Sequence, residues 1–207
     1  MRKQQRIGIM GGTFDPIHYG HLVTAEEALV QFNLDSVVFM PTGRPVRKTH
    51  RVVTPAEHRY LMTVIATASN PDFSVSRMEI DRPGPTYTVD TMLQSRETLG
   101  ASAELYFITG ADAVWEILTW KDTERLRDTC TFIAATRPGY DLGKFREEGL
   151  AEGLELEFME VPALAISSTD IRARVMQRRP IRYLLPEAVA SYITKNRLYK
   201  DGDDGVA

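Results

Sequence analysis

Two glycines and two histidines near the start of the chain have the residue types and spacing to handle a phosphate. Residues 6–10 are an apolar run typical of a strand, and Gly11 and Gly12 follow it directly. Paired glycines permit a tight turn and let a ligand approach the bare backbone. His18 and His21 are among the first residues of a predicted helix, and their i, i+3 spacing puts both imidazoles on one face. N–H groups and the positive dipole end at a helix start favour an anion there.

This stretch has three interpretations on its residues alone. The histidines could belong to an ordinary turn, as surface or capping residues. They could chelate a metal ion, since His-x-x-His can do so, with Asp15 and Asp112 as the only evident further ligands. They could form an anion-stabilising pair for phosphate chemistry, which we favour, so we nominate no metal ligand. The dinucleotide fingerprint G-x-G-x-x-G is absent, and residues 139–145 only imitate a P-loop, which disfavours hydride transfer and P-loop hydrolysis.

Short apolar runs alternate with helical patterns along most of the chain. Strands are predicted at residues 6–10, 36–40, 73–75, 104–109, 130–135 and 154–159. Helices are predicted at residues 18–32, 54–68, 88–99, 112–119, 123–126, 169–178 and 186–196, with Thr54 as an N-cap and Gly100 as a C-terminal stop. This alternation predicts a doubly wound, Rossmann-like parallel α/β sheet with helices on both faces. One domain is expected over residues 1–200, followed by a frayed tail at 201–207.

Composition limits the class of protein. The 207 residues are 43% hydrophobic, enough for a core, and the net charge of -3 lacks the basic footprint of a nucleic-acid binder. An anion site must therefore be a local cluster of cations. Cys130 is the only cysteine, which fits a reducing cytosol, and no apolar run is long enough for a membrane span. A cytoplasmic chain without nucleic-acid or membrane partners is expected, and homo-oligomerisation is left open.

Hydroxyls and cations gather at two further places. Ser167, Ser168 and Thr169 precede a helix, and Arg172 follows one turn later. Alone, these residues would be ordinary caps, with Ser167 and Asp170 approximating a capping box. Together with the first motif, they predict a second anion cradle built from hydroxyls, helix N–H groups and a guanidinium. A loop over residues 41–51 is rich in cations, and His58 and Arg59 in the next helix are expected only to support it.

Residues 11–22, Gly-Gly-Thr-Phe-Asp-Pro-Ile-His-Tyr-Gly-His-Leu, resemble the Gly-x-Phe-Asp-Pro-x-His-x-Gly-His signature of the nucleotidylyltransferase superfamily. The full string is similar to the bacterial nicotinate-mononucleotide adenylyltransferase branch, and matching motifs continue through Arg172. The resemblance implies transfer of the adenylyl group of ATP to nicotinate mononucleotide. The products would be nicotinate adenine dinucleotide (deamido-NAD) and pyrophosphate, a step of NAD biosynthesis. It also implies direct attack without a covalent enzyme intermediate.

The same resemblance implies two sets of binding residues beside the catalytic pair His18 and His21. Mg²⁺ would arrive with ATP, bound mainly to phosphate oxygens and water. The residues expected to bind ATP and its phosphates are Gly11, Gly12, Thr13, Phe14, Lys48, Ser167, Ser168, Thr169 and Arg172. The residues expected to bind nicotinate mononucleotide are Tyr87, Thr88, Gly110, Asp112, Trp120 and Arg137.

Several points stay open at this level. Val46-Arg47 stands where the family often has Pro-His, so the role of Arg47 and the conformation of residues 41–54 are undecided. Tyr87 and Trp120 could stack a pyridinium ring, although either aromatic alone is more often a core residue. Arg137 could meet a base or a carboxylate. The rival acceptors are nicotinamide mononucleotide and phosphopantetheine, and the rival classes are a related cytidylyltransferase, a non-catalytic nucleotide sensor and a His-metal protein.

Overall fold

The computed structural model describes residues 4–45, 52–100, 102–111, 123–126, 129–137, 139 and 155–200. Three features expected from the sequence lie outside these residues: the helix at 112–119, the tail at 201–207, and the part of the cationic loop that holds Lys48. Asp112 and Trp120 also lie outside them. The expected roles of these residues therefore stay predictions.

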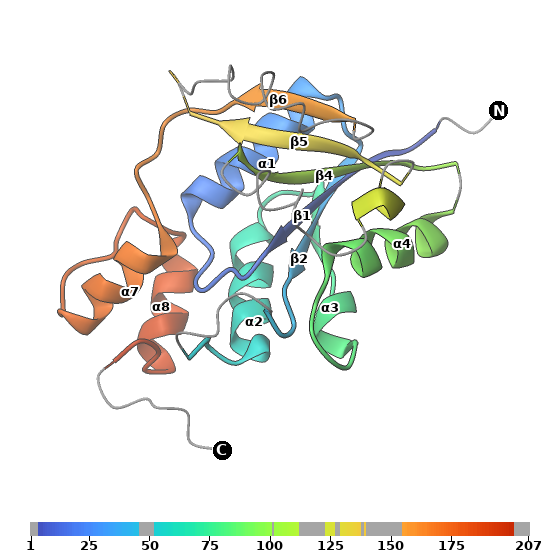
Figure 1. The fold of residues 1–207 in the computed structure, drawn as a ribbon. Helices are drawn as coiled ribbons and strands as arrows, with labels where there is room; N and C mark the ends of the chain where they lie inside the picture. Colours follow the sequence, from blue (N-terminus) through green and yellow to red (C-terminus); the bar gives the residue numbers. More distant parts are fainter. Residues whose placement is uncertain are drawn as a thin grey trace. The chain divides into compact units, whose positions relative to one another are not determined.

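Six strands form one sheet in the order β3-β2-β1-β4-β5-β6. They are β1 (Arg6–Gly12), β2 (Ser36–Pro41), β3 (Phe73–Val75), β4 (Glu104–Gly110), β5 (Thr131–Thr136) and β6 (Leu156–Glu160). β4 runs parallel to β1 and to β5, and β5 runs parallel to β6. β4 and β5 are seen side by side in Figure 1. All six predicted strands are confirmed, with ends shifted by at most two residues, and the parallel α/β class is confirmed with them.

The central strands are apolar on both faces because both faces are covered. Ile9, Ile108 and Ile133 are all 1% exposed or less. A Cβ on Gly8 would lie 2.8 Å from Cδ1 of Ile108, so a larger residue at this position would force neighbouring core side chains to shift. This double burial explains the nearly continuous apolar runs in the sequence.

The helices are α1 (Tyr19–Gln31), α2 (Ala56–Thr67), α3 (Met78–Asp81), α4 (Thr88–Leu99), α7 (Ser168–Met176) and α8 (Glu187–Lys195), with a 3₁₀ turn η1 (Thr123–Leu126). Gly100 ends α4 as predicted, with φ 85° and its N–H donated to the Arg96 carbonyl at 2.9 Å. Two predicted starts were wrong. α1 begins at Tyr19, so His18 precedes the helix, and the N-cap of α2 is Pro55 rather than Thr54.

The chain divides into two compact units, each drawn from three stretches of sequence. The first comprises residues 1–11, 23–38 and 87–163, and it holds β4, β5, β6 and α4. The second comprises residues 12–22, 39–86 and 164–207, and in it α2 lies beside β3 and α8. The domain boundary expected at residue 200 remains a prediction.

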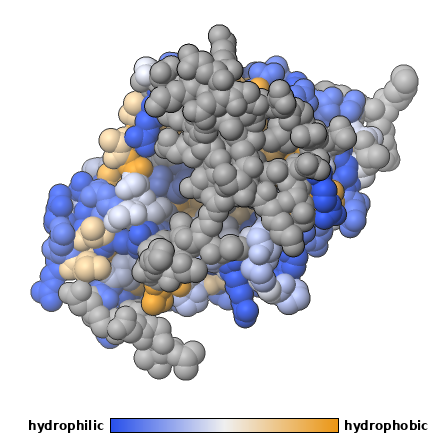
Figure 2. Space-filling view, viewed as in Figure 1, coloured by the Kyte–Doolittle hydropathy of each residue, from blue (hydrophilic) through white to orange (hydrophobic). Residues whose placement is uncertain are grey.

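The described surface is mostly polar on the face shown in Figure 2, with small apolar areas between hydrophilic residues. Scattered exposed apolar residues are normal for a folded chain. No helix in the described ranges is long and apolar enough to cross a membrane.

Candidate active site

The loop at residues 13–18, here called the His18 loop, has a strained backbone held by a buried ring. Phe14 has φ 49°, in the left-handed region, and its side chain is 2% exposed. Its ring lies edge-on to His21, with centroids 5.1 Å apart, and also contacts Phe39 at 5.7 Å. A Cβ on Gly12 would lie 2.7 Å from the Phe14 ring, so glycine is required there. Burial of the ring offsets the cost of this conformation.

His18 and His21 form a stacked pair at the start of α1. Their ring centroids are 3.8 Å apart with an interplanar angle of 27°. The His18 carbonyl accepts the N–H groups of His21 and Leu22, and the His18 N–H donates to Nδ1 of His21 at 3.2 Å. Nδ1 of His21 is therefore an acceptor, which places the proton of its neutral ring on Nε2. His21 thus presents an Nε2–H donor.

His18 is a buried, neutral imidazole. Its side chain is 7% exposed, and burial lowers its pKa to about 4. Its Nδ1 is buried and has no hydrogen-bond partner within the described part of the chain. A buried polar atom without a partner is costly, and such atoms in native structures call for an explanation. At neutral pH, His18 can supply one N–H donor without carrying a positive charge.

Gly20, between the two histidines, lets His18 lie against the start of the helix. A Cβ there would be 3.0 Å from both Cε1 and Nδ1 of His18. A side chain at this position would force the imidazole to shift by a few tenths of an ångström. The glycine within the His-Tyr-Gly-His string thus leaves room for the first histidine.

The first turn of α7 is tied to the His18 loop by side-chain hydrogen bonds. Ser167 is the N-cap, and its Oγ accepts the Asp170 N–H at 3.1 Å, which confirms that half of the expected capping box. The Ser168 hydroxyl donates to the Pro16 carbonyl at 2.8 Å. Arg172 donates to the Asp15 carbonyl at 2.6 Å and to the Thr169 hydroxyl at 3.1 Å.

The hydroxyls and guanidinium expected to face phosphate therefore hold the backbone that carries His18. In the second unit the structure brings together two groups that the sequence predicted separately, at residues 12–21 and 167–172. Direct contact of Ser168, Thr169 or Arg172 with a phosphate stays a prediction.

Arg59, in α2, also binds the backbone of the His18 loop. Its guanidinium is 1% exposed and donates to the carbonyls of Thr13 at 2.9 Å, Gly43 at 3.1 Å and Thr54 at 2.8 Å. The expectation that Arg59 supports the cationic loop is confirmed by the bond to Gly43. Its bond to Thr13 was not foreseen, because an arginine in a first helical turn gives no sign in the sequence that it is buried.

The described root of the cationic loop is also fixed. A Cβ on Gly43 would lie 2.1 Å from the carbonyl oxygen of Glu79, which only glycine avoids. Two hydrogen bonds join Arg44 and Thr86. The Arg44 N–H donates to the Thr86 hydroxyl at 3.2 Å, and the Thr86 N–H donates to the Arg44 carbonyl at 3.0 Å.

Tyr199 is a partner of the His18 loop that the sequence analysis did not identify. Its hydroxyl donates to Oδ1 of Asp15 at 2.9 Å, and Asp15 is 1% exposed. Burial, and next the negative charge of Asp15, raise the pKa of Tyr199. In the sequence, Tyr199 is a tyrosine just after an apolar helix, and this pattern does not predict a contact with residues near the start of the chain.

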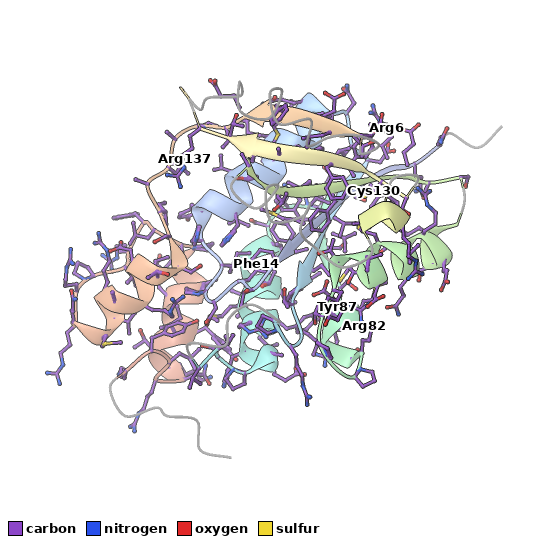
Figure 3. The ribbon with its side chains drawn as sticks, viewed as in Figure 1. Arg6, Phe14, Arg82, Tyr87, Cys130 and Arg137 are labelled. Carbon is purple, nitrogen blue, oxygen red and sulfur yellow. The ribbon has the colours of Figure 1, made fainter. Side chains whose placement is uncertain are left out.

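The described residues expected to bind the acceptor lie in the first unit, which also contains β1 as far as Gly11. Gly110 ends β4, and Arg137 follows β5 with its side chain exposed. Gly110 pairs with Ala135, two residues before Arg137. Gly110 and Arg137 therefore both stand at the carboxyl edge of the parallel strands, where such sheets bind ligands. Figure 3 shows Arg137 and Cys130 at opposite ends of β5. Tyr87 and Thr88 are the N-cap and first residue of α4.

The metal interpretation gains no support from the described residues. Among them, no group of three or more His, Cys, Asp and Glu side chains is arranged to hold a metal ion. The stacking of His18 on His21 also differs from a chelating arrangement, in which the two ring nitrogens converge on one point.

Comparison with known sequences gives long matches. The sequence model of the cytidylyltransferase-like family matches residues 9–174. A Moorella thermoacetica protein named "Probable nicotinate-nucleotide adenylyltransferase" is 58% identical over 205 residues, covering 97% of this chain and 94% of the relative. A Thermoanaerobacter protein of the same name is 55% identical and covers 100% of both chains.

Solved structures agree on the fold. The Plasmodium falciparum nicotinic acid mononucleotide adenylyltransferase complexed with NaAD has a TM-score of 0.74 and 22% identity, over 94% of this chain and 97% of that chain. The same enzyme complexed with APC has a TM-score of 0.75 and 21% identity. From the family match and the two bacterial relatives, the chain belongs to the cytidylyltransferase-like family and, within it, to the nicotinate-nucleotide adenylyltransferases.

Proposed function

We propose that the protein transfers the adenylyl group of ATP to nicotinate mononucleotide, forming nicotinate adenine dinucleotide and pyrophosphate in NAD biosynthesis. The observation that carries this proposal is the stacked pair of His18 and His21 at the start of α1, in which burial lowers the pKa of His18 and keeps it neutral. The names of the bacterial relatives supply the substrates.

The reaction needs no protein nucleophile. An oxygen of the 5′-phosphate of nicotinate mononucleotide attacks the α-phosphorus of ATP, and a new P–O bond forms. The bond between the α-phosphorus and the oxygen bridging to the β-phosphorus breaks, and its electron pair leaves with pyrophosphate. The protein aligns two anions that repel each other and stabilises charge on the α- and β-phosphates.

His18 and His21 would supply that stabilisation as hydrogen-bond donors. His21 would donate from Nε2, because its Nδ1 already accepts the His18 N–H. His18 enters the reaction neutral and could become protonated once a phosphate lies beside it, since an anion favours the charged imidazole. The unpartnered Nδ1 of His18 would gain a partner in either case.

The backbone of the His18 loop would add further donors. The Thr13 carbonyl faces Arg59, and the Pro16 carbonyl faces Ser168. A trans peptide directs the next N–H opposite to its carbonyl, so the N–H groups of Phe14 and Ile17 face away from these two side chains. We place the triphosphate on that side of the loop.

The remaining assignments belong to this proposal. Mg²⁺ would enter as part of the ATP substrate. Lys48, Ser167, Ser168, Thr169 and Arg172 would contact ATP, and Tyr87, Thr88, Gly110, Asp112, Trp120 and Arg137 would line the acceptor site. We propose a cytoplasmic enzyme with no nucleic-acid partner.

Pyrophosphate release tests the function directly. Purified protein is assayed with Mg²⁺ and ATP against nicotinate mononucleotide, nicotinamide mononucleotide and phosphopantetheine, and with CTP in place of ATP. The highest kcat/KM is expected for ATP with nicotinate mononucleotide. Activity with none of the acceptors would remove the enzymatic function, and a higher kcat/KM with another acceptor would reassign the substrate.

A further inference from the structure

The His18 loop is fastened by side-chain donors from three separate parts of the sequence. Arg59 of α2 binds the Thr13 carbonyl, and Ser168 and Arg172 of α7 bind the carbonyls of Pro16 and Asp15. The Tyr199 hydroxyl donates to the Asp15 carboxylate. Of these four hydrogen bonds, this is the one whose acceptor is a side chain of the loop rather than a backbone carbonyl. Tyr199 also lies beyond residue 174, where the family match ends.

The segment that carries Tyr199 is itself held in place. It follows α8, and the Leu198 N–H donates to the Ile193 carbonyl at 3.1 Å while the Leu198 side chain is 5% exposed. Tyr199 has φ 62°, a left-handed conformation that is uncommon for a tyrosine. A backbone that adopts this conformation beside a buried contact is held there by its surroundings.

Asp15 lies three residues before His18, and both its carbonyl and its carboxylate are bound from outside the loop. A change in the position of Asp15 therefore also changes the position of the residues that lead to His18. We propose that Tyr199 is a positioning residue for adenylyl transfer, holding the His18 loop in its reactive conformation through the hydrogen bond to Asp15. This inference rests on the proposed function, because the reactive conformation is defined by that reaction.

A purely structural role for Tyr199 is the main alternative, and the chain offers a matched control. The Tyr199 hydroxyl also has a side-chain hydrogen bond to Thr54, which lies outside the His18 loop. Tyr192 makes a hydroxyl contact in the same unit, to Nδ1 of His58 at 2.8 Å, and this contact joins α8 to α2 without touching the His18 loop. Tyr192→Phe and Tyr199→Phe each remove one hydroxyl and keep the ring. A structural role predicts the same behaviour for both variants.

The first readout is the rate, measured well below the unfolding temperature of each variant. Tyr199→Phe is expected to lower kcat about 10- to 100-fold, with a change in KM for ATP of less than about threefold, because a small displacement of a catalytic group is costly. Tyr192→Phe is expected to stay within about twofold of the wild type. A kcat for Tyr199→Phe within twofold of the wild type, or an equal fall in both variants, would overturn the proposal.

The second readout does not depend on activity. The titration of His18 is followed by NMR in the unliganded protein, where burial sets its pKa to about 4. Tyr199→Phe is expected to raise this pKa toward 6.5, since a loosened loop admits water. Tyr192→Phe should leave it unchanged. An unchanged His18 titration in Tyr199→Phe would contradict the proposal even if kcat fell.

A second pair of variants covers the outcome that Tyr199→Phe alone does not fold. Asp15→Asn keeps an acceptor for the Tyr199 hydroxyl, and adding Tyr199→Phe to it removes the bond without burying an unpaired charge. The double variant is expected to have a kcat at least about tenfold below that of Asp15→Asn alone. Equal rates would overturn the proposal. A wild type without pyrophosphate release from any acceptor would instead refute the proposed function.

Discussion

The two units position their candidate functional residues in different ways. In the second unit, the His18 loop is irregular backbone whose carbonyls are bound by buried or partly buried side chains. In the first unit, Gly110 and Arg137 stand where regular strands end, so the sheet itself places them. For the proposed reaction, the difference predicts that phosphate chemistry depends on a network of single hydrogen bonds, whereas acceptor recognition depends on strand register.

Removing the centre of the network should have the largest effect. Arg59→Met leaves the carbonyls of Thr13, Gly43 and Thr54 without that donor. The free energy of unfolding is expected to fall by about 3 to 5 kcal/mol, because each buried or partly buried carbonyl that loses its donor costs roughly 1 to 3 kcal/mol. Urea unfolding measures this. The control is Arg77→Met, which removes surface ion pairs with Glu57 and Asp81 and a cation-π contact with Tyr60, and it should lower the free energy of unfolding far less.

Removing one donor of the pair should affect turnover rather than folding. His18→Ala is expected to lower kcat by about 10²- to 10³-fold, the range for the loss of one preorganised donor, with a smaller change in ATP binding. Steady-state kinetics and ATP titration separate the two effects. Turnover like that of the wild type would refute the donor role of His18 and leave the network as a purely structural device.

The buried imidazole should also make stability depend on pH. The folded pKa of His18, about 4, lies below the ordinary value of 6.5, so the unfolded state binds the proton more readily. The contribution of His18 to the free energy of unfolding is fully present above pH 6.5. It is lost as the pH falls toward 4, by roughly 3 kcal/mol in all. Urea unfolding at pH 7 and pH 4.5 should show a smaller loss for His18→Gln than for the wild type. Equal losses would contradict the burial of a neutral His18.

Substitution of Arg137, at the edge of the sheet, should have the smallest effect and should alter the binding of one substrate only. Arg137→Ala is expected to raise the KM for nicotinate mononucleotide about tenfold, equivalent to one lost charged hydrogen bond, with kcat and stability little changed. The same variant assayed with nicotinamide mononucleotide shows whether Arg137 meets a carboxylate, because only the acid should then lose affinity. A fall in stability instead would place Arg137 in a network like that of the second unit.

The sheet could be predicted from the sequence because its strands are buried on both faces, and runs such as residues 104–109 are apolar throughout. The paired histidines and the Ser167 cap could be found because they are encoded in short, local strings. Their partners could not, because the bonds from Arg59 to Thr13 and from Tyr199 to Asp15 span 46 and 184 residues.

Local rules also failed where tertiary bonds compete with them. Thr54 has the residue type of an N-cap, yet its carbonyl is used by Arg59, and α2 starts one residue later than predicted. α3, of four residues, was not predicted because it is too short to show a helical period. Its place is fixed instead by the close approach of Gly43 to the Glu79 carbonyl.

The hydrogen bond from Tyr199 to Asp15 also has a consequence for the order in which the protein is made. Asp15 and His18 are synthesised before Tyr199, which is added 184 positions after Asp15. At about 5 to 20 residues per second, the interval is roughly 10 to 40 s. During that time the nascent chain carries His18 and His21 without the hydrogen bond from Tyr199, so the proposed reactive conformation of the His18 loop is expected only after Tyr199 has been added.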